Sequence, residues 1–172
     1  SLDLSAGTID IDFVLHDDAG PGSRFAETVA TGDRVGALGP GGGGLAEADW
    51  YLFAGDETAL PAIARMLESL QAGARGRAIV EVADEGEIQP LQTAADIAIE
   101  WLLRDGVPAG TTTLLAEAVR AVAFPQNGER IYVWAGCEHD AFRAIRSFVR
   151  QEKKLKSHEH LVMSYWRRGV AD

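Results

Sequence analysis

Short apolar runs alternate with helical stripes from Trp50 towards the end of the chain. The run from Trp50 to Ala54 is apolar at every position, which is typical of a strand buried on both faces of a sheet. Gly55 is then expected to let the backbone turn sharply, and Thr58 to cap a helix with Pro61 in its first turn. That helix is predicted to bury a stripe of residues at helical spacing: Leu60, Ile63, Leu67 and Leu70.

The same alternation continues and predicts further strands over Arg77 to Ala83, Ile97 to Leu103, Ile131 to Ala135 and Leu161 to Trp166. An amphipathic helix is expected over Thr112 to Phe124, with an inward stripe of Leu114, Leu115, Ala118, Val119 and Val122. A second such helix follows Gly136 to Asp140, and its inward residues are Phe142, Ile145, Phe148 and Val149. Only about a dozen residues join the second and third strands, so any helix between them is short or absent. These repeated units predict an α/β fold, with a mainly parallel five-stranded sheet flanked by helices.

The first 44 residues predict a different kind of sheet. Thr8 to His16 alternates apolar and polar residues, as a half-exposed antiparallel strand does. A short helix is expected over Arg24 to Val29, capped by Ser23, and a short strand over Arg34 to Leu38. Two strands and one short helix are too few for an independent core, so this segment is interpreted as the C-terminal end of a larger β-domain.

A run of small residues from Gly39 to Gly44 is the predicted linker between this segment and a second domain over residues 45–172. The run also fits the dinucleotide-binding pattern G-x-G-x-x-G. Any run of glycines fits that pattern, and a strand follows it rather than a helix of useful length, so we interpret the run as a connector.

Composition restricts the classes of function. The formal net charge of −10 argues against a surface that follows a nucleic acid backbone, which needs clustered Lys and Arg. No apolar run is long enough to span a bilayer, so membrane insertion is not expected. Cys137 is the only cysteine, which excludes an internal disulfide and fits a reducing compartment such as the cytoplasm.

The turn from Gly55 to Ala59 is the first candidate site. Open α/β sheets bind nucleotides where a strand delivers its carboxyl end to a helix N-terminus, because free amides and the helix dipole favour phosphate. A plain scaffold turn is an equally good interpretation of the pattern alone. The pair His158 and His160 is interpreted as part of a solvated loop, because no third metal ligand is evident. Cys137 precedes a predicted helix, where a thiolate is favoured, but core packing is the preferred interpretation.

Three pieces of the sequence carry a resemblance to a known family: Ala54 to Ala62, Val133 to Glu138 and Tyr165 to Gly169. In order and spacing they are similar to the siderophore-interacting protein family, ferric-siderophore reductases related to the ferredoxin–NADP reductases. The N-terminal segment also resembles the end of that family's flavin domain, at His16, at Gly20 to Phe25 and at Gly32 to Arg34. The resemblance implies an FAD-binding antiparallel β-barrel, of which residues 1–44 are the remnant and linker, followed by an NAD(P)H-binding domain.

The resemblance also implies roles for particular residues, and FAD would be bound by His16, Gly22, Ser23 and Arg24. NADH or NADPH would be bound by Gly55, Asp56, Glu57, Thr58, Ala59, Gly136, Cys137 and Glu138. Tyr165 and Trp166 would stack on an adenine or a flavin ring. Asp56 and Glu57 repel phosphate, so they are expected to contact ribose hydroxyls or to cap the helix. The two aromatic residues are equally well interpreted as core. Phosphate or an anionic ferric siderophore would be bound by Arg167 and Arg168.

The expected function is that of an NAD(P)H- and FAD-dependent ferric-siderophore reductase, in which the cofactors carry the redox chemistry, so no catalytic side chain or metal ligand is assigned. A non-enzymatic siderophore-binding or partner-binding module and a general flavin reductase are the alternatives. The family's flavin-gripping Arg-x-Tyr-Thr/Ser motif is absent, so this chain is expected to hold FAD poorly and to be inactive without the missing FAD-binding barrel. Gly136-Cys137-Glu138 also departs from the family's Ala-Gly-Glu, and Ser164 stands where the family has Gly before Tyr-Trp.

Overall fold

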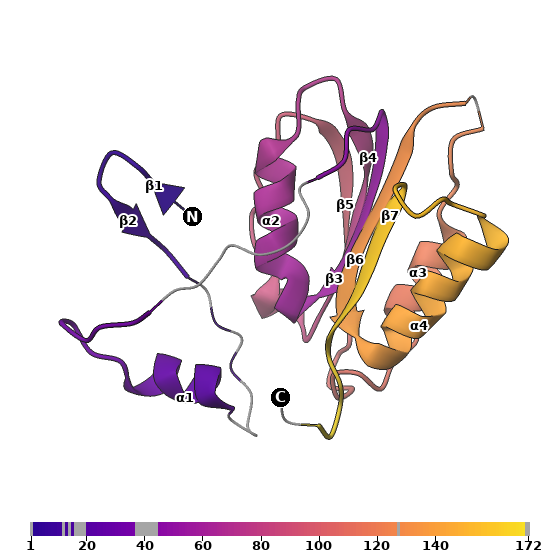
Figure 1. The fold of residues 1–172 in the computed structure, drawn as a ribbon. Helices are drawn as coiled ribbons and strands as arrows, with labels where there is room; N and C mark the ends of the chain where they lie inside the picture. Colours follow the sequence, from indigo (N-terminus) through magenta and orange to yellow (C-terminus); the bar gives the residue numbers. More distant parts are fainter. Residues whose placement is uncertain are drawn as a thin grey trace. The chain divides into compact units, whose positions relative to one another are not determined.

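The computed structural model describes residues 2–11, 13, 15, 20–36, 45–126 and 128–170. These residues belong to two units, one that ends at Leu45 and one that spans Ala46–Val170 (Figure 1). The predicted linker from Gly39 to Gly44 and the candidate residue His16 lie outside the described residues.

The first unit contains, in its described part, a two-stranded antiparallel hairpin and one helix. Strands β1 (Leu2–Asp3) and β2 (Thr8–Ile9) form the hairpin, and α1 spans Pro21–Thr28. The strand predicted over Thr8 to His16 is therefore wrong for the described residues that follow Ile9. A longer strand needs a partner to cover its apolar face, and here that face is exposed at Ile9, Ile11, Phe13 and Leu15.

Helix α1 begins at Pro21, earlier than the predicted start at Arg24. Proline is favoured at the start of a helix because its fixed φ suits the helix and its missing N–H costs nothing there. Ser23 is therefore inside the helix, and the N-cap is Gly20, which has no side chain to cap with. The predicted strand from Arg34 is also wrong in its described part, because residues 34–36 are irregular.

The second unit is built on five strands: β3 (Trp50–Asp56), β4 (Arg75–Val82), β5 (Asp96–Leu103), β6 (Ile131–Glu138) and β7 (His160–Trp166). They form one sheet in the order β5-β4-β3-β6-β7, and every neighbouring pair is parallel. The predicted α/β class and the five predicted strands are confirmed. Strand β3 lies at the centre and is buried at every position.

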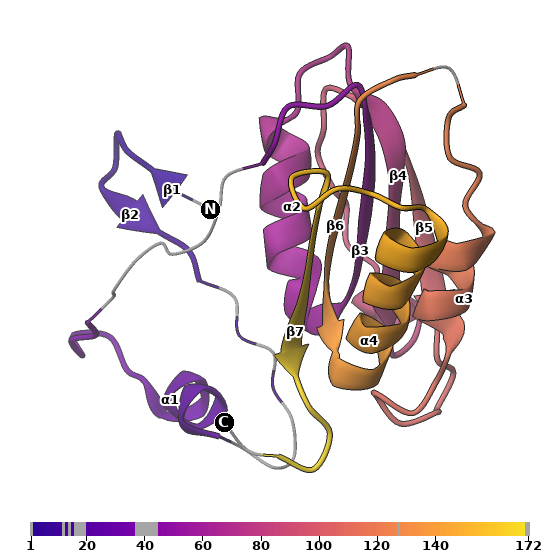
Figure 2. The same cartoon turned by 45° about the vertical axis from the view of Figure 1, so that its right-hand side comes forward.

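Helices cover both faces of this sheet, with α2 on one face and α3 and α4 on the other (Figures 1 and 2). The helices and turns are η1 (Glu57–Ala59), α2 (Leu60–Ser69), η2 (Glu85–Glu87), α3 (Leu114–Ala121), α4 (His139–Ser147) and the π-helical turn η3 (Phe148–Glu152). Only the short turn η2 lies between β4 and β5, as the short connection predicts. The order of strands reverses between β3 and β6, and such a switch point is where open α/β sheets bind ligands.

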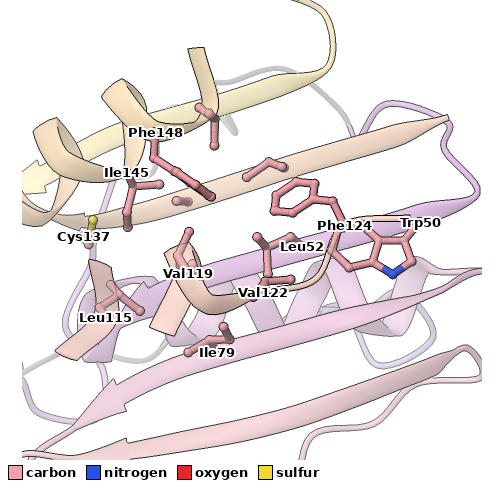
Figure 3. Close-up of a cluster of buried hydrophobic side chains, with 14 residues drawn as sticks. Trp50, Leu52, Ile79, Leu115, Val119, Val122, Phe124, Cys137, Ile145 and Phe148 are labelled. Carbon is pink, nitrogen blue, oxygen red and sulfur yellow. The ribbon is translucent and has the colours of Figure 1, made fainter. Parts of the chain in front are cut away.

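A hydrophobic core fills the space between the sheet and helices α3 and α4 (Figure 3). The Phe124 ring contacts those of Trp50 and Phe148, at centroid distances of 5.3 and 6.1 Å. Leu114 was predicted to point inward, but it is the first residue of α3 and is 38% exposed. The fully buried residues of α3 are Leu115 and Val119, and those of α2 are Leu60, Ile63 and Leu67.

Gly76 offers a direct test of the β3–β4 register. It pairs with Tyr51 and has φ +156°, and a Cβ built on it would lie 1.9 Å from the Tyr51 carbonyl oxygen. Gly76→Ala should therefore lower the free energy of unfolding by about 2–4 kcal/mol, measured by urea denaturation. Gly73→Ala is the control, because its added Cβ meets nothing within 4 Å. Equal midpoints for the two variants would contradict this packing.

Candidate functional site

The carboxyl ends of β3 and β6 lie side by side. Gly55 pairs with Gly136 at the end of the parallel ladder, and the amide of Glu138 donates to the carboxylate of Asp56 at 2.9 Å. The two turns thus meet at the switch point of the sheet, where the nucleotide was expected.

Asp56 is buried at this edge, with 5% of its surface exposed. Its Oδ1 accepts hydrogen bonds from the amide (3.1 Å) and the hydroxyl of Thr58. Its Oδ2 accepts from the amide of Glu138 and from the indole N–H of Trp166, each at 2.9 Å. The cap of this turn is therefore Asp56, and the prediction that Thr58 caps the helix is wrong. Burial raises the pKa of Asp56 above its ordinary value, although these hydrogen bonds act to lower it.

Glu57, Arg104 and Glu81 form a second charged group on the same edge. The guanidinium of Arg104 makes two hydrogen bonds to the carboxylate of Glu57 and lies 3.6 Å from that of Glu81. Burial alone would lower the pKa of Arg104, but the hydrogen bonds and charge of Glu57, together with Glu81, raise it. Arg104 therefore remains charged, and its charge is already matched within the chain.

Sequence reasoning missed both Arg104 and Glu81. Glu81 is the single charged residue in the buried part of β4, and Arg104 directly follows the apolar strand β5. An isolated charge inside or directly after an apolar strand was the available signal, because such a group needs a partner once it is buried.

Three strand-end carboxylates satisfy the amides at the starts of the following helical segments. Asp56 accepts from Thr58 at η1, Glu81 from Leu115 at α3 (3.2 Å), and Glu138 from the amide of Asp140 at α4. The amide of Thr58, which was expected to meet a nucleotide phosphate, is therefore engaged by a carboxylate. Asp56 was expected either to contact a ribose hydroxyl or to cap the helix, and in the structure it caps η1. Negative charge at these helix starts disfavours phosphate and suits hydroxyl or amide donors of a ligand.

A small pocket opens at this edge, with room for little more than a water molecule. Its polar lining comes from Asp56, Glu81, Arg104, Thr112 and Glu138. Gly110 lines the pocket too. A Cβ on Gly110 would lie 2.8 Å from Cγ of Glu138 and 2.9 Å from Cη2 of Trp166. The loop before α3 therefore packs directly on Glu138 and Trp166.

Gly55 and Gly136, at the ends of β3 and β6, are also required by close packing. Gly55 lies inside β3, so the sharp turn predicted at this residue is wrong. A Cβ on Gly55 would lie 2.6 Å from Cβ of Ala59 and 2.9 Å from the carbonyl oxygen of Gly136. A Cβ on Gly136 would lie 3.0 Å from the rings of Trp134 and Tyr165. Small residues here let η1 and β7 approach the strand ends.

Cys137 is a residue of β6 and is fully buried on the face that α3 and α4 cover, beside Leu115 and Ile145 (Figure 3). Burial raises the pKa of its thiol, and the nearby carboxylates of Asp56, Glu138 and Glu81 raise it further. The interpretation of Cys137 as a packing residue is confirmed, and a reactive thiolate is disfavoured.

The C-terminal candidates start at the end of β7. Tyr165 is 37% exposed and meets Trp134 edge to face at a centroid distance of 6.0 Å, and its pKa is raised by burial. Trp166 is half-buried and bonded to Asp56, so it packs at the sheet edge. The side chains of Arg167 and Arg168 are exposed.

The remaining candidates lie elsewhere. In the first unit Gly22 and Arg24 are exposed and Ser23 is buried, at the start of a helix without an acidic residue in its first turn. His160 contacts the carbonyl of Lys156 at 2.8 Å through Nδ1. Across the described residues, no group of three or more His, Cys, Asp or Glu is placed to hold a metal ion. Nor is any helix in these ranges long and apolar enough to cross a membrane.

Two protein-family models match this chain. Residues 48–169 match the family model described as siderophore-interacting protein, and residues 1–44 match the siderophore-interacting FAD-binding domain. The chain therefore belongs to the siderophore-interacting protein family.

Solved structures agree with this assignment. A siderophore utilization protein from T. fusca superposes with a TM-score of 0.88 at 45% identity, over 98% of this chain and 64% of that one. The siderophore-interacting protein SipS from Aeromonas hydrophila superposes with a TM-score of 0.82 at 33% identity, over 98% and 70%. These likenesses confirm the five-stranded parallel sheet flanked by helices that the sequence predicts.

Curated relatives carry names that refer to iron reduction. The ferric vibriobactin reductase ViuB of Vibrio cholerae is 33% identical over 163 residues, which are 94% of this chain and 59% of the relative. The ferric acinetobactin reductase of Acinetobacter baumannii is 26% identical over 167 residues, 95% of this chain and 57% of the relative. The chain thus spans less than two thirds of the length of either relative.

The burial of Cys137 predicts an unreactive thiol. In the folded chain at pH 8, a thiol-specific chromogenic disulfide reagent should leave Cys137 unmodified during the time in which the urea-unfolded chain reacts completely. Ser157→Cys is the positive control, because residue 157 is exposed and its new thiol should react at once. Rapid labelling of the folded wild-type chain would contradict the core position of Cys137.

Proposed function

We propose that this chain is the NAD(P)H-binding domain, with the adjoining end of the FAD-binding domain, of a ferric-siderophore reductase. The observation that carries the proposal is the switch point between β3 and β6, in a chain whose two parts match the siderophore-interacting and FAD-binding families. The names of the relatives support iron(III) held by a siderophore as the electron acceptor.

The nicotinamide nucleotide would lie across the carboxyl ends of β3 and β6. The residues there fit its uncharged parts: Glu57, whose side chain is 19% exposed, offers acceptors for ribose hydroxyls and for the nicotinamide amide. They do not fit its phosphates, which need the exposed cations Arg167 and Arg168 after β7. The packed Cys137 lies below this surface, so it would shape the floor of the site.

FAD would be held in part by the first unit. Helix α1 begins at Pro21, and the dipole at a helix start favours a pyrophosphate near Gly22, Ser23 and Arg24, which the family resemblance assigns to FAD. We keep His16 as a further FAD contact on the strength of the family resemblance. When bound, FAD supplies the step from a hydride donor to a one-electron acceptor, so that iron(III) is reduced and iron(II) is released from the weaker complex.

A non-enzymatic siderophore-binding module is the second candidate function. The carboxylates that cap η1, α3 and α4 favour it, because they oppose the phosphates of a nucleotide. For either function we propose the cytoplasm as the location, because a reducing compartment suits a chain with one cysteine.

The proposal is tested with this chain joined to a complete FAD-binding domain, under anaerobic conditions. NADH or NADPH should bleach the absorbance of the bound flavin, and a ferric siderophore should restore it while an iron(II)-specific chelator develops colour. The same siderophore loaded with gallium(III), which is not reduced, is the matched control and should leave the flavin bleached. Free flavin and a small redox protein serve as competing acceptors.

Two results would contradict the reductase proposal. If the protein does not bind flavin, or binds flavin that neither nucleotide reduces, the siderophore-binding module is favoured instead. A protein that reduces free flavin faster than the ferric siderophore is a general flavin reductase. This chain alone should bind FAD more weakly than the complete protein in a fluorescence titration.

A further inference from the structure

We propose that Asp56 and Glu138 are positioning residues that fix the segment from Tyr165 to Arg168 across the carboxyl edge of the sheet. In this position the exposed side chains of the segment meet the nucleotide and the chelate. The use of the segment in binding rests on the proposed function, whereas its fixation is measurable on this chain alone.

The segment leaves the regular ladder at the end of β7. Cys137 pairs with Ser164 and Glu138 pairs with Trp166, so Tyr165 is an additional residue in an irregular register. An extra residue of this kind re-aims the side chains that follow, and such irregularities are frequent beside functional sites. Beyond Trp166 the chain makes an isolated bridge between Arg167 and Val170, outside the named strands.

Two buried carboxylates hold the segment at two points. The indole N–H of Trp166 donates to Oδ2 of Asp56 at 2.9 Å, and the amide of Arg168 donates to Oε1 of Glu138 at 3.1 Å. Asp56 also accepts from the amide of Glu138 itself, so the two carboxylates form one connected group. Each of them is only 5% exposed, and hydrogen bonds to a carboxylate shielded from water are strong.

The loop before α3 packs against Glu138 and Trp166 through Gly110. Gly110 has φ +69°, and its missing Cβ leaves the space that Cγ of Glu138 and Cη2 of Trp166 occupy. Trp166 is therefore enclosed between Asp56, Glu138 and Gly110, which come from three different parts of the chain.

The enclosure of Trp166 fixes the backbone that carries the neighbouring exposed side chains. Tyr165, Arg167 and Arg168 are exposed, and long arginine side chains lose binding energy when their main-chain anchor is mobile. Asp56 thus influences ligand binding through Trp166 and the segment around it, without itself touching the chelate.

The first experiment measures hydrogen exchange of the Trp166 indole N–H by NMR, with the signal assigned by its absence in Trp166→Phe. Asp56→Asn keeps the side-chain volume but removes the charge and one acceptor, and Asp56→Ser is too short to reach the indole. Exchange should accelerate about tenfold in Asp56→Asn and more in Asp56→Ser. The indole signals of Trp50 and Trp134 should stay unchanged, which shows that the fold is intact.

Asp84→Asn is the matched control. Asp84 caps η2 through the amide of Gly86 at 2.8 Å, in the same way that Asp56 caps η1, but among the described contacts it makes none with the segment. It should leave exchange at Trp166 unchanged. Unchanged exchange at Trp166 in both Asp56 variants would overturn the proposal.

The second experiment uses the protein with its complete FAD-binding domain. Asp56→Asn should raise the KM for the nucleotide about tenfold while kcat changes less than about twofold, because binding contacts are displaced and the reacting groups are kept. Trp166→Phe should act similarly, and the double variant should be no worse than either single one, because both remove the same bond. A merely structural role would lower kcat through loss of folded protein.

The outcomes of the two experiments are separable. Fast indole exchange together with an unchanged KM would overturn the role of the fixed segment in binding. If the wild-type protein reduces no flavin with either nucleotide, the proposed reductase function fails. The exchange rates then still decide whether Asp56 fixes the segment.

Discussion

The carboxylate of Asp56 is the interaction on which the carboxyl edge of the sheet depends. It stands at the end of the central strand β3 and accepts hydrogen bonds from Thr58 of η1, Glu138 of β6 and Trp166 of β7. Removing a carboxylate from water is costly unless donors replace the lost hydration, so these elements must come together once β3 is buried. One side chain thus links the ends of β3, β6 and β7 to the start of η1.

Glu81 and Glu138 repeat the arrangement at α3 and α4, where negative charge meets the positive end of a helix. The helix starts are therefore satisfied within the chain, and a bound anion must find its positive charge elsewhere. In the described part of the second unit every arginine before α4 forms an ion pair: Arg65, Arg75, Arg77, Arg104, Arg120 and Arg130. Arg167 and Arg168 form no ion pair with any described carboxylate, so their charges are available to a ligand.

Side-chain periodicity was enough to predict the strands, because burial on a sheet is a property of each segment. The apolar run from Trp50 became β3, and the stripe from Leu60 became the buried face of α2. The cap of η1 depended instead on burial: Asp56, the last residue of β3, has a carboxylate that needs donors, which Thr58 supplies. Periodicity alone does not reveal such a need.

Contacts between residues far apart in the sequence could not be predicted from local sequence patterns either. Arg104 and Glu57 are 47 positions apart, and Trp166 and Asp56 are 110 apart, so neither pair leaves a local signature. The predicted turn at Gly55 failed for the same reason, since this glycine is required by the approach of Ala59 and Gly136. In the first unit the alternation from Thr8 to His16 was real, but a strand requires a neighbour as well as a pattern.

We propose that the nicotinamide nucleotide binds at the carboxyl ends of β3 and β6. The most direct test is a titration of this chain with NADH and with NADPH, followed through the backbone amide signals in NMR spectra. We expect the shift changes to concentrate at residues 55–59, 136–140 and 165–168. Shift changes confined to other residues would contradict this placement of the nucleotide. The absence of any shift change, at nucleotide concentrations that reduce the flavin of the complete protein, would contradict it as well.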